Sequence, residues 1–394
     1  MTAVAQWHII TCEYPPQRGG VSDYTRLVAQ GLAEKGDRVH VWCPSTCSPE
    51  PHTSGVDVHR SLGQITVRDL MCVDKSLNEF PSPRRLLVQW VPHGYRYRSM
   101  NLPFCLWLWN RARRKHDEVE IMVHEPFLPF RGGTWQQAIA AAIHRVMILI
   151  LLNGATRIWI AIPAWRDRLQ PYMLGRRIPI QWLPVPSNVE CSVNVAKIVD
   201  ATDTGSPGTQ HTLGHFGTFG WPISKMLGPL VPELLRGYAN RSLVLMGRGS
   251  TEFRLKIIEQ NPDLATQISA TGEVGAGELS YWIHKCNVMI QPYPDGVSSR
   301  RGTAMAALSH GVPIVTTAGS LTEDIWAQSG AAALVPPWDV NLFRDAVNNL
   351  LADEQKLNGM GSRATRLYLD RFHVEHTIQT LRSSHQQNLA VCES

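Results

Sequence analysis

Residues 6–43 follow the order strand, glycine turn, helix, strand, and this order constrains the fold more than any other feature of the sequence. Residues 6–11 and 38–43 are short apolar runs typical of buried strands. Between them, four apolar residues recur on one helical face: Tyr24, Leu27, Val28 and Leu32. Gly36 follows where a glycine commonly ends a helix. Because the two strands are joined through a helix, they predict a parallel sheet with helices on both faces, as in an α/β fold.

The same alternation continues to residue 351. Further strands are expected at residues 86–90, 120–124, 157–162, 181–184, 211–217, 242–247, 288–292, 313–317 and 332–335. Helices are expected at residues 101–116, 135–152, 227–238, 302–310 and 340–351. Residues 196–210 are rich in Gly, Ser, Thr and Pro and have the composition of a linker.

A chain of 394 residues exceeds one ordinary core, so we expect two domains. The linker places a first Rossmann-like domain at residues 1–195 and a second at residues 211–368, with a closing helix in residues 369–394. Ligands of such folds bind at the carboxyl ends of the strands, here in the crevice between the domains.

Composition excludes several classes of protein. With 44% hydrophobic and 18% charged residues the chain is typical of globular proteins, and a net charge of +5 is too low for a nucleic-acid binder. The eight cysteines show no metal-site spacing, which favours separate thiols in a reducing compartment. Residues 1–6 lack the features of a secretory signal, so we expect a cytoplasmic protein. Residues 138–152 are apolar but short for a bilayer span, which favours a buried helix.

Two loops carry residues suited to phosphate or sugar. The first places Gly19 and Gly20 at the start of a helix, where free amides favour anions, although a tight turn without a ligand is the alternative. It lacks the Gly-x-Gly-x-x-Gly of a dinucleotide fold, which argues against an NAD(P)-dependent oxidoreductase. The second loop opens the helix expected at residues 302–310 and presents Asp295, Ser298, Ser299, Arg300, Arg301 and Gly302. Two arginines beside free helix amides suit a diphosphate; a solvated loop with surface arginines is the alternative.

Several patches resemble glycosyltransferase family 4. Residues 291–317 are similar to its donor-site segment, and Leu334-Val-Pro-Pro-Trp-Asp339 is similar to its Leu-Val-Pro-Pro-Gly-Asp turn. Residues 214–220 with Lys225, residues 245–250, residues 368–372 and the loop Arg18–Gly20 resemble further family segments in the same order. The resemblance implies the GT-B fold, with an acceptor-side N-terminal domain and a C-terminal domain that holds a nucleoside diphosphate sugar. It also implies transfer with retention of anomeric configuration. No Asp-x-Asp occurs, so neither a metal nor another cofactor is expected.

The sequence departs from the family at its paired glutamates, which are normally separated by seven residues. Counting back from Gly311 and Pro313 places these positions at Ser298 and Ala306. The second glutamate normally holds the nucleotide ribose, a role that Ala306 leaves unassigned. Asp295 could replace the first glutamate near the transferred sugar only if the loop is rearranged. Alternatively, Arg300 or Arg301 would bind the donor instead. A degenerate, non-catalytic site is the alternative.

Polar residues elsewhere receive roles by the same resemblance. His124 matches a histidine near the donor sugar, where an imidazole can orient a hydroxyl or share a proton, with Glu125 as a candidate partner. His93 and Glu125 are candidates on the acceptor side. Lys225 and Arg248 would neutralise the leaving diphosphate, together with the arginines of the second loop. A structural hydrogen bond is the alternative role for each histidine.

Residues 104–116 combine aromatic residues with a basic run. The segment could dock on the inner face of an anionic membrane, or its aromatic residues could pack inside the first domain with the basic end solvated.

Two hypotheses for function follow. The first is a retaining transferase that acts on a nucleotide sugar and an acceptor hydroxyl of a carbohydrate, lipid or small molecule. The second is a GT-B scaffold that binds nucleotide or a partner without turnover. No nucleic-acid partner is expected.

Overall fold

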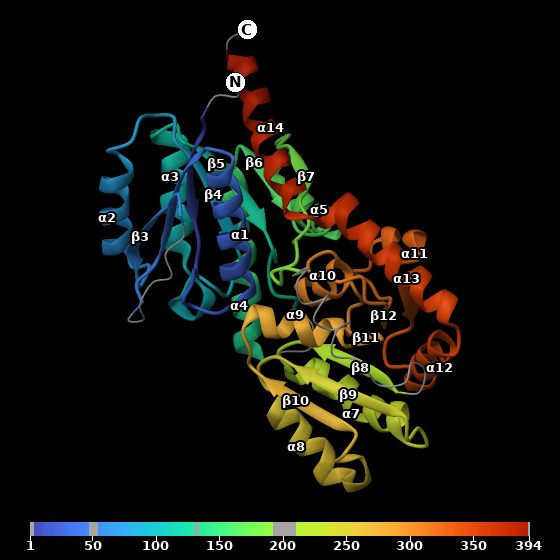
Figure 1. The fold of residues 1–394 in the computed structure, drawn as a ribbon. Coiled ribbons are helices and arrows are strands. Elements are labelled where there is room, and N and C mark those ends of the chain that lie inside the picture. The colour runs from blue at the N-terminus through green and yellow to red at the C-terminus, as the bar shows by residue number, and fades with distance from the viewer. Residues whose placement is uncertain (1–3, 47–53, 131–133, 192–209, 393–394) are drawn as a thin grey trace. The chain divides into compact units, whose positions relative to one another are not determined.

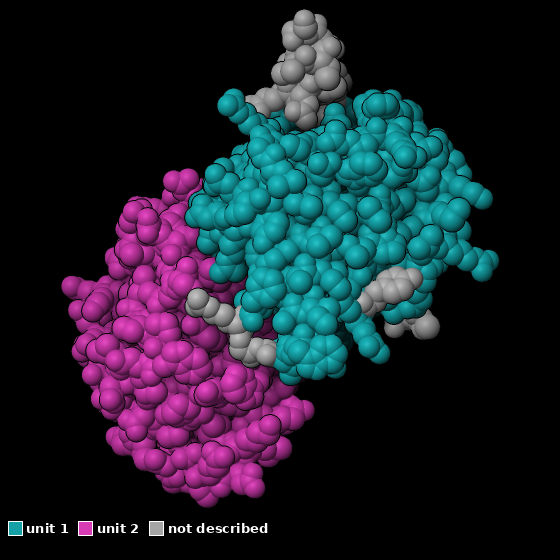
Figure 2. Space-filling view, turned by 180° about the vertical axis from the view of Figure 1, so that it is seen from behind, with its two compact units in different colours: residues 1–184, 374–394 teal, residues 185–373 magenta. Residues whose placement is uncertain are grey.

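The computed structural model describes residues 4–46, 54–130, 134–191 and 210–392, and it divides into two compact units (Figure 1). Unit 1 comprises residues 1–184 and 374–394, and unit 2 comprises residues 185–373 (Figure 2). The chain therefore passes from one unit to the other at Pro184 and again at His373. Of the expected linker, residues 196–209 lie outside the described residues.

Unit 1 is built on a parallel sheet in the order β3-β2-β1-β4-β5-β6-β7. Its strands are β1 Gln6–Ile10, β2 Arg38–Pro44, β3 Val56–Gly63, β4 Arg85–Trp90, β5 Glu118–Val123, β6 Arg157–Ile160 and β7 Ile180–Trp182. Its helices are α1 Gly20–Glu34, α2 Val67–Leu77, α3 Leu102–Arg114, α4 Trp135–Gly154, α5 Ala164–Leu169 and α14 Val374–Cys392, with short 3-10 turns at Tyr97–Ser99 and Gln170–Met173. The α/β prediction is confirmed for this half. Strand β3 was not expected from the sequence.

Helix α4 is less buried than its composition predicts. Trp135, Ile139 and Val146 are exposed, whereas the side that carries Met147 and Leu151 is buried. The expectation of a buried helix is therefore wrong for one face of α4. Among the described helices, α4 is the one long and apolar enough to cross a membrane by length and composition, with 39% of its apolar window buried.

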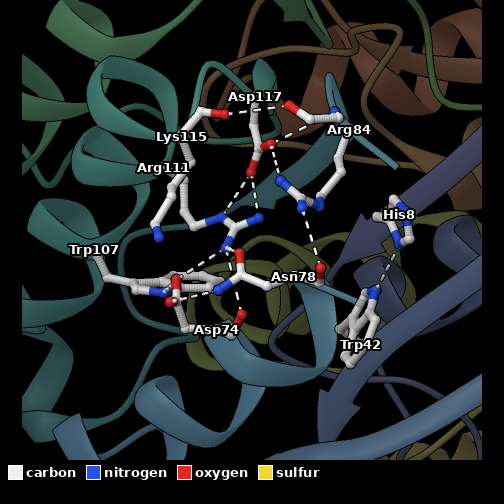
Figure 3. Close-up of polar contacts among 10 residues, drawn as sticks. His8, Trp42, Asp74, Asn78, Arg84, Trp107, Arg111, Lys115 and Asp117 are labelled. Carbon is white, nitrogen blue, oxygen red and sulfur yellow. Dashed lines mark hydrogen bonds and ion pairs between the residues drawn. The ribbon is translucent and has the colours of Figure 1, made fainter. Parts of the chain in front are cut away.

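Helix α3 packs between α2 and α4 and ends in a buried charge cluster. Arg111 is fully buried, and its Nη1 lies 2.9 Å from Oδ1 of Asp74 (Figure 3). Asp117 is also buried and accepts hydrogen bonds from Arg111 at 2.6 Å and from Arg84 at 3.0 Å (Figure 3). The predicted basic end of this segment is thus not wholly solvated, because Arg111 is buried. Its charge is compensated by the carboxylates of Asp74 and Asp117.

The aromatic residues of α3 take part in unit 1 rather than forming an exposed apolar face. The indole of Trp107 donates to Asp74 at 3.2 Å, and that of Trp109 donates to Asn153 at 2.9 Å. Leu106 is the large apolar residue of this helix that stands exposed. For residues 104–116 the packing of the aromatic residues therefore agrees with the structure, whereas the solvated basic end agrees only in part because Arg111 is buried.

The final helix, α14, completes unit 1. It packs against α1, where Ile378 faces Gly31. Arg85 of β4, which is buried and paired with Glu120 at 2.6 Å, also donates to the carbonyl of Leu381 at 3.0 Å. The buried Arg85 of the sheet thus makes one of its hydrogen bonds to helix α14, 296 residues later in the chain.

Unit 2 is a second parallel sheet, in the order β10-β9-β8-β11-β12-β13. Its strands are β8 His211–Phe216, β9 Arg241–Met246, β10 Ile268–Gly272, β11 Val288–Gln291, β12 Ile314–Thr317 and β13 Ala332–Val335. Its helices are α7 Trp221–Leu235, α8 Ser250–Gln260, α9 Ala276–His284, α10 Gly302–Ser309, α11 Asp324–Ser329, α12 Val340–Leu351 and α13 Glu354–Leu367; a 3-10 turn spans Pro262–Leu264 and a π-helical turn Tyr368–Phe372. Apolar residues of β8, β9, β11, α7 and α12 share one core.

Candidate functional site

Each sheet reverses its strand order once, and the loops at that reversal carry most of the predicted site residues. In unit 1 the reversal lies between β1 and β4, and in unit 2 between β8 and β11. Loops that leave neighbouring strands at such a point diverge to opposite faces of the sheet, which leaves room for a ligand at the carboxyl ends.

The glycine loop after β1 is occupied by a side chain that sequence reasoning missed. Oε1 of Glu13 accepts hydrogen bonds from the amides of Val21 and Ser22, each at 3.0 Å. These amides open helix α1, so the carboxylate takes the place predicted for a donor phosphate or sugar oxygen. Gly19 is needed for the close approach of Glu13, whereas no atom lies within 4 Å of a Cβ built on Gly20.

His124 follows β5 and is held inside unit 1. Its Nε2 lies 2.9 Å from the amide oxygen of Gln89, and its ring meets the edge of Tyr24 at 4.8 Å between centroids. Burial lowers the pKa of His124 to about 3. The imidazole is therefore neutral at pH 7.

His93 and Glu125 follow the neighbouring strands β4 and β5 and lie near one another. Nδ1 of His93 stands 3.9 Å from Oε2 of Glu125, and both side chains are exposed. The sequence analysis paired Glu125 with His124, whereas the structure also brings Glu125 close to His93. Exposed polar groups at the ends of neighbouring strands could meet a ligand hydroxyl.

The loop between β11 and α10, residues 292–301, is called the donor loop below. Within it Asp295 contacts both Arg300 and Arg301, one carboxylate oxygen to each guanidinium. The guanidinium of Arg301 also stacks on Tyr293, 4.6 Å from the ring centroid. These three side chains, one carboxylate and two guanidiniums, together carry a net positive charge beside the N-terminus of α10, which suits an anion.

Ser299 ties the donor loop to a second acidic residue that the sequence analysis missed. Glu323 accepts hydrogen bonds from the Ser299 amide at 3.0 Å and from its hydroxyl at 2.5 Å. The indole of Trp326 donates to the same carboxylate at 2.9 Å. Burial raises the pKa of Glu323 above its ordinary value of 4.5 despite these bonds. Glu323 therefore brings a carboxylate to this loop from 24 residues away.

The two positions at which the family resemblance would place the paired glutamates lie inside unit 2. Ser298 and Ala306 are both fully buried. The Ser298 hydroxyl has no hydrogen-bond partner within the described part of the chain. A direct contact of Ser298 with a sugar thus requires the donor loop to move. Gly302, the first residue of α10, is partly exposed and could offer its amide.

The remaining predicted cations follow the strands on one side of the reversal. Lys225 lies on α7, with its Nζ 5.0 Å from the ring centroid of Trp221 and 5.6 Å from that of Trp338, and both indoles are exposed. Arg248 follows β9 and is exposed. Gly247 and Gly217 bring the loops after β9 and β8 together, since a Cβ on Gly247 would stand 2.4 Å from the Gly217 carbonyl oxygen.

Comparisons with known proteins agree with this architecture. Residues 210–353 match the family model described as glycosyl transferases group 1. Sucrose-phosphate synthase from Thermosynechococcus elongatus aligns over 98% of this chain and 100% of its own, with a TM-score of 0.74 and 15% identity. Anabaena Alr3699/HepE, in a structure described as a complex with UDP and glucose, aligns over 97% and 100%, with a TM-score of 0.67 and 14% identity. No curated protein matches the sequence.

A third structure, an α,α-trehalose-phosphate synthase (UDP-forming) from Burkholderia xenovorans, aligns over 98% of this chain and 100% of its own, with a TM-score of 0.66 and 12% identity. The chain thus has the GT-B fold of glycosyltransferases, two parallel α/β units of Rossmann-like design. The match of residues 210–353 places the glycosyl transferases group 1 segment in unit 2, and together these findings support a glycosyltransferase.

Proposed function

We propose that this protein transfers a sugar from a nucleoside diphosphate sugar to an acceptor hydroxyl, with retention of anomeric configuration and without a metal ion. The observation that carries the proposal is the donor loop at the strand reversal of unit 2, where Arg300, Arg301 and the start of α10 gather positive charge around Asp295. A leaving diphosphate gains negative charge in the transition state, so fixed cations there lower the barrier.

Roles follow from the chemistry of each group. Arg301 and Lys225 would hold the diphosphate, with Arg248 and Arg300 near it, and Asp295 would face the transferred sugar. His124, which is neutral, would orient a hydroxyl rather than carry a proton. Two features of Ser298 and Ala306 support the non-catalytic alternative. Both residues are buried, and neither has an acidic side chain.

The first donor to test is UDP-glucose, since related structures of the Anabaena protein are described as complexes with UDP and UDP-glucose. Thermal unfolding is measured with UDP, GDP, ADP and TDP and with their sugar conjugates, because a ligand that binds the folded state raises Tm. Release of the nucleoside diphosphate then reports turnover, and NMR of the sugar product reports its anomeric configuration. Added Mg²⁺ or Mn²⁺ is expected to leave turnover unchanged.

Arg301→Ala is expected to lower kcat/KM at least about 100-fold, the usual cost of losing one donor to a developing anion. Arg236→Ala is the matched control, because Arg236 forms an exposed surface pair with Asp263 on unit 2. Nucleotide binding without release of product would support the scaffold hypothesis instead. Equal turnover in Arg301→Ala and the parent would refute the assigned site.

A further inference from the structure

Three potential metal ligands from distant parts of the sequence meet in unit 2. The ligand atoms of Cys191, His284 and His310 all lie within 4.8 Å of one another. His284 is the last residue of α9, His310 caps the C-terminus of α10, and Cys191 lies on the segment that enters unit 2 at Val185. None of the three belongs to the donor loop, and the proposed transfer reaction uses none of them.

In both histidines, Nδ1 is held by a backbone carbonyl oxygen one helical turn earlier. Nδ1 of His284 lies 2.9 Å from the carbonyl oxygen of Ser280, and Nδ1 of His310 lies 2.7 Å from that of Ala306. Because a carbonyl can only accept, each Nδ1 carries the proton and each Nε2 carries a lone pair. A backbone carbonyl in this role is one of the common supports of a metal-binding histidine.

The separation of Cys191 from His284 fits a small, tetrahedral ion. Sγ of Cys191 stands 3.7 Å from Nε2 of His284. Zn–S and Zn–N bonds of about 2.3 and 2.05 Å at a tetrahedral angle separate sulfur from nitrogen by about 3.6 Å. Sulfur with two imidazoles is a ligand set that favours Zn²⁺ over Mg²⁺ or Ca²⁺.

One hydrogen bond competes with the ion. The hydroxyl of Ser280 lies 2.8 Å from Nε2 of His310, so it must turn away before that lone pair can bind a metal. Access is open, because both histidines line a cavity of about 460 Å³ and Cys191 is exposed.

We propose that Cys191, His284 and His310 bind one Zn²⁺ ion, with water as the fourth ligand. The thiol of Cys191 gives its proton to solvent as the Zn–S bond forms. The ion would fasten residues 185–191 to the ends of α9 and α10. The other end of this segment is already bound to the donor loop, because the amide of Val185 donates to the carbonyl of Ser299 at 3.0 Å.

The site is tested on the full chain after treatment with a chelator and exchange into metal-free buffer. Titration with Zn²⁺ is expected to give one bound ion per chain and a rise in Tm of about 5 °C at 100-fold excess over Kd. Co²⁺ is expected to give visible d–d bands and the near-ultraviolet charge-transfer band of a thiolate ligand. Failure to bind Zn²⁺, or a Co²⁺ spectrum without that band, would overturn the proposal.

Variants separate this site from stray binding. Cys191→Ser and His284→Gln are each expected to weaken Zn²⁺ at least about 100-fold, more than loss of an outer-shell partner costs. Cys72→Ser, which removes an exposed thiol of unit 1, is the matched control and should bind like the parent. Ser280→Ala removes the competing hydroxyl and should bind equally well or more tightly. Undiminished binding in Cys191→Ser would contradict the assignment, and metal-free unfolding of each variant checks that it folds.

Discussion

Glu13 lies so close to Gly19 that a Cβ built on Gly19 would stand 2.1 Å from its Oε1. The same oxygen accepts the amides of Val21 and Ser22 at the start of α1. The glycine loop of unit 1 is therefore shaped around a carboxylate of the protein itself. Any anionic ligand at this helix start must displace Glu13 or bind beside it.

Gly19→Ala is expected to destabilise the protein by about 1–3 kcal/mol, because the new methyl group must push Glu13 off the helix amides. Gly20→Ala is the matched control, since nothing lies within 4 Å of its added Cβ. That neighbouring substitution should be neutral or stabilising by up to about 1 kcal/mol. Unfolding in urea measures both, and equal effects at the two glycines would contradict the proposed contact.

Asp295→Asn is expected to separate binding from turnover. The change leaves Arg300 and Arg301 without their shared carboxylate, so the donor loop gains one positive charge and should bind UDP at least as tightly. Turnover of the sugar donor should fall at least about 100-fold if the carboxylate acts on the transferred sugar. Calorimetry gives the UDP affinity and product release gives the rate. Unchanged turnover in this variant would show that Asp295 does not act on the transferred sugar and serves only as the ion-pair partner of the two arginines.

The pKa of His124, lowered by burial from 6.5 to about 3, makes a prediction for stability. The unfolded chain takes up the proton first as the pH falls, so stability is lost progressively from pH 6.5 down to about 3, by at most about 1.4 kcal/mol per pH unit. His124→Gln should lose less stability than the parent between pH 7 and pH 5. The exposed His93→Gln is the control for removing a histidine. Parallel curves for the parent and His124→Gln would argue against a buried neutral imidazole.

Trp338 has a φ of 70°, a backbone conformation that favours glycine, at the position where the resembling family turn has glycine. Trp338→Gly removes this backbone strain but also removes the exposed contact of the indole with Lys225. The net effect is expected to be a rise in the free energy of unfolding of up to about 1 kcal/mol. Trp338→Asn should give an intermediate gain, because asparagine tolerates this conformation. A loss of stability in both variants would show that the contacts of the indole outweigh the strain.

The elements that the sequence predicted well are those with a plain apolar pattern. Residues 332–335 and 340–351 appear as β13 and α12 with the expected bounds. Strands β3 and β10 were missed because both lie at sheet edges and alternate little between buried and exposed residues. Helix α7 begins at Trp221 instead of residue 227, since Pro222, Pro229 and Pro232 hide its periodicity.

The site was harder to predict because its partners are separated along the chain. The donor loop and its arginines were found from a local motif, at the helix start where the structure has them. Glu323 reaches Ser299 from another loop, and no spacing rule connects the two. Burial of His124 likewise depends on Gln89 and Tyr24, which belong to other elements. Short-range patterns indicate candidate loops, whereas the protonation state of a group depends on neighbours that only the fold brings near.

The return of α14 to unit 1 bears on the order in which the protein acquires its structure during synthesis. When the ribosome has completed residues 1–184, Arg85 still lacks the Leu381 carbonyl and Asp37 still lacks Arg382, which bonds it at 3.0 Å in the finished protein. All of unit 2 must be translated before these groups are joined. The half of the protein that emerges first is therefore the half that is completed last, and nascent chains stalled before residue 374 should expose the surface that α14 later covers.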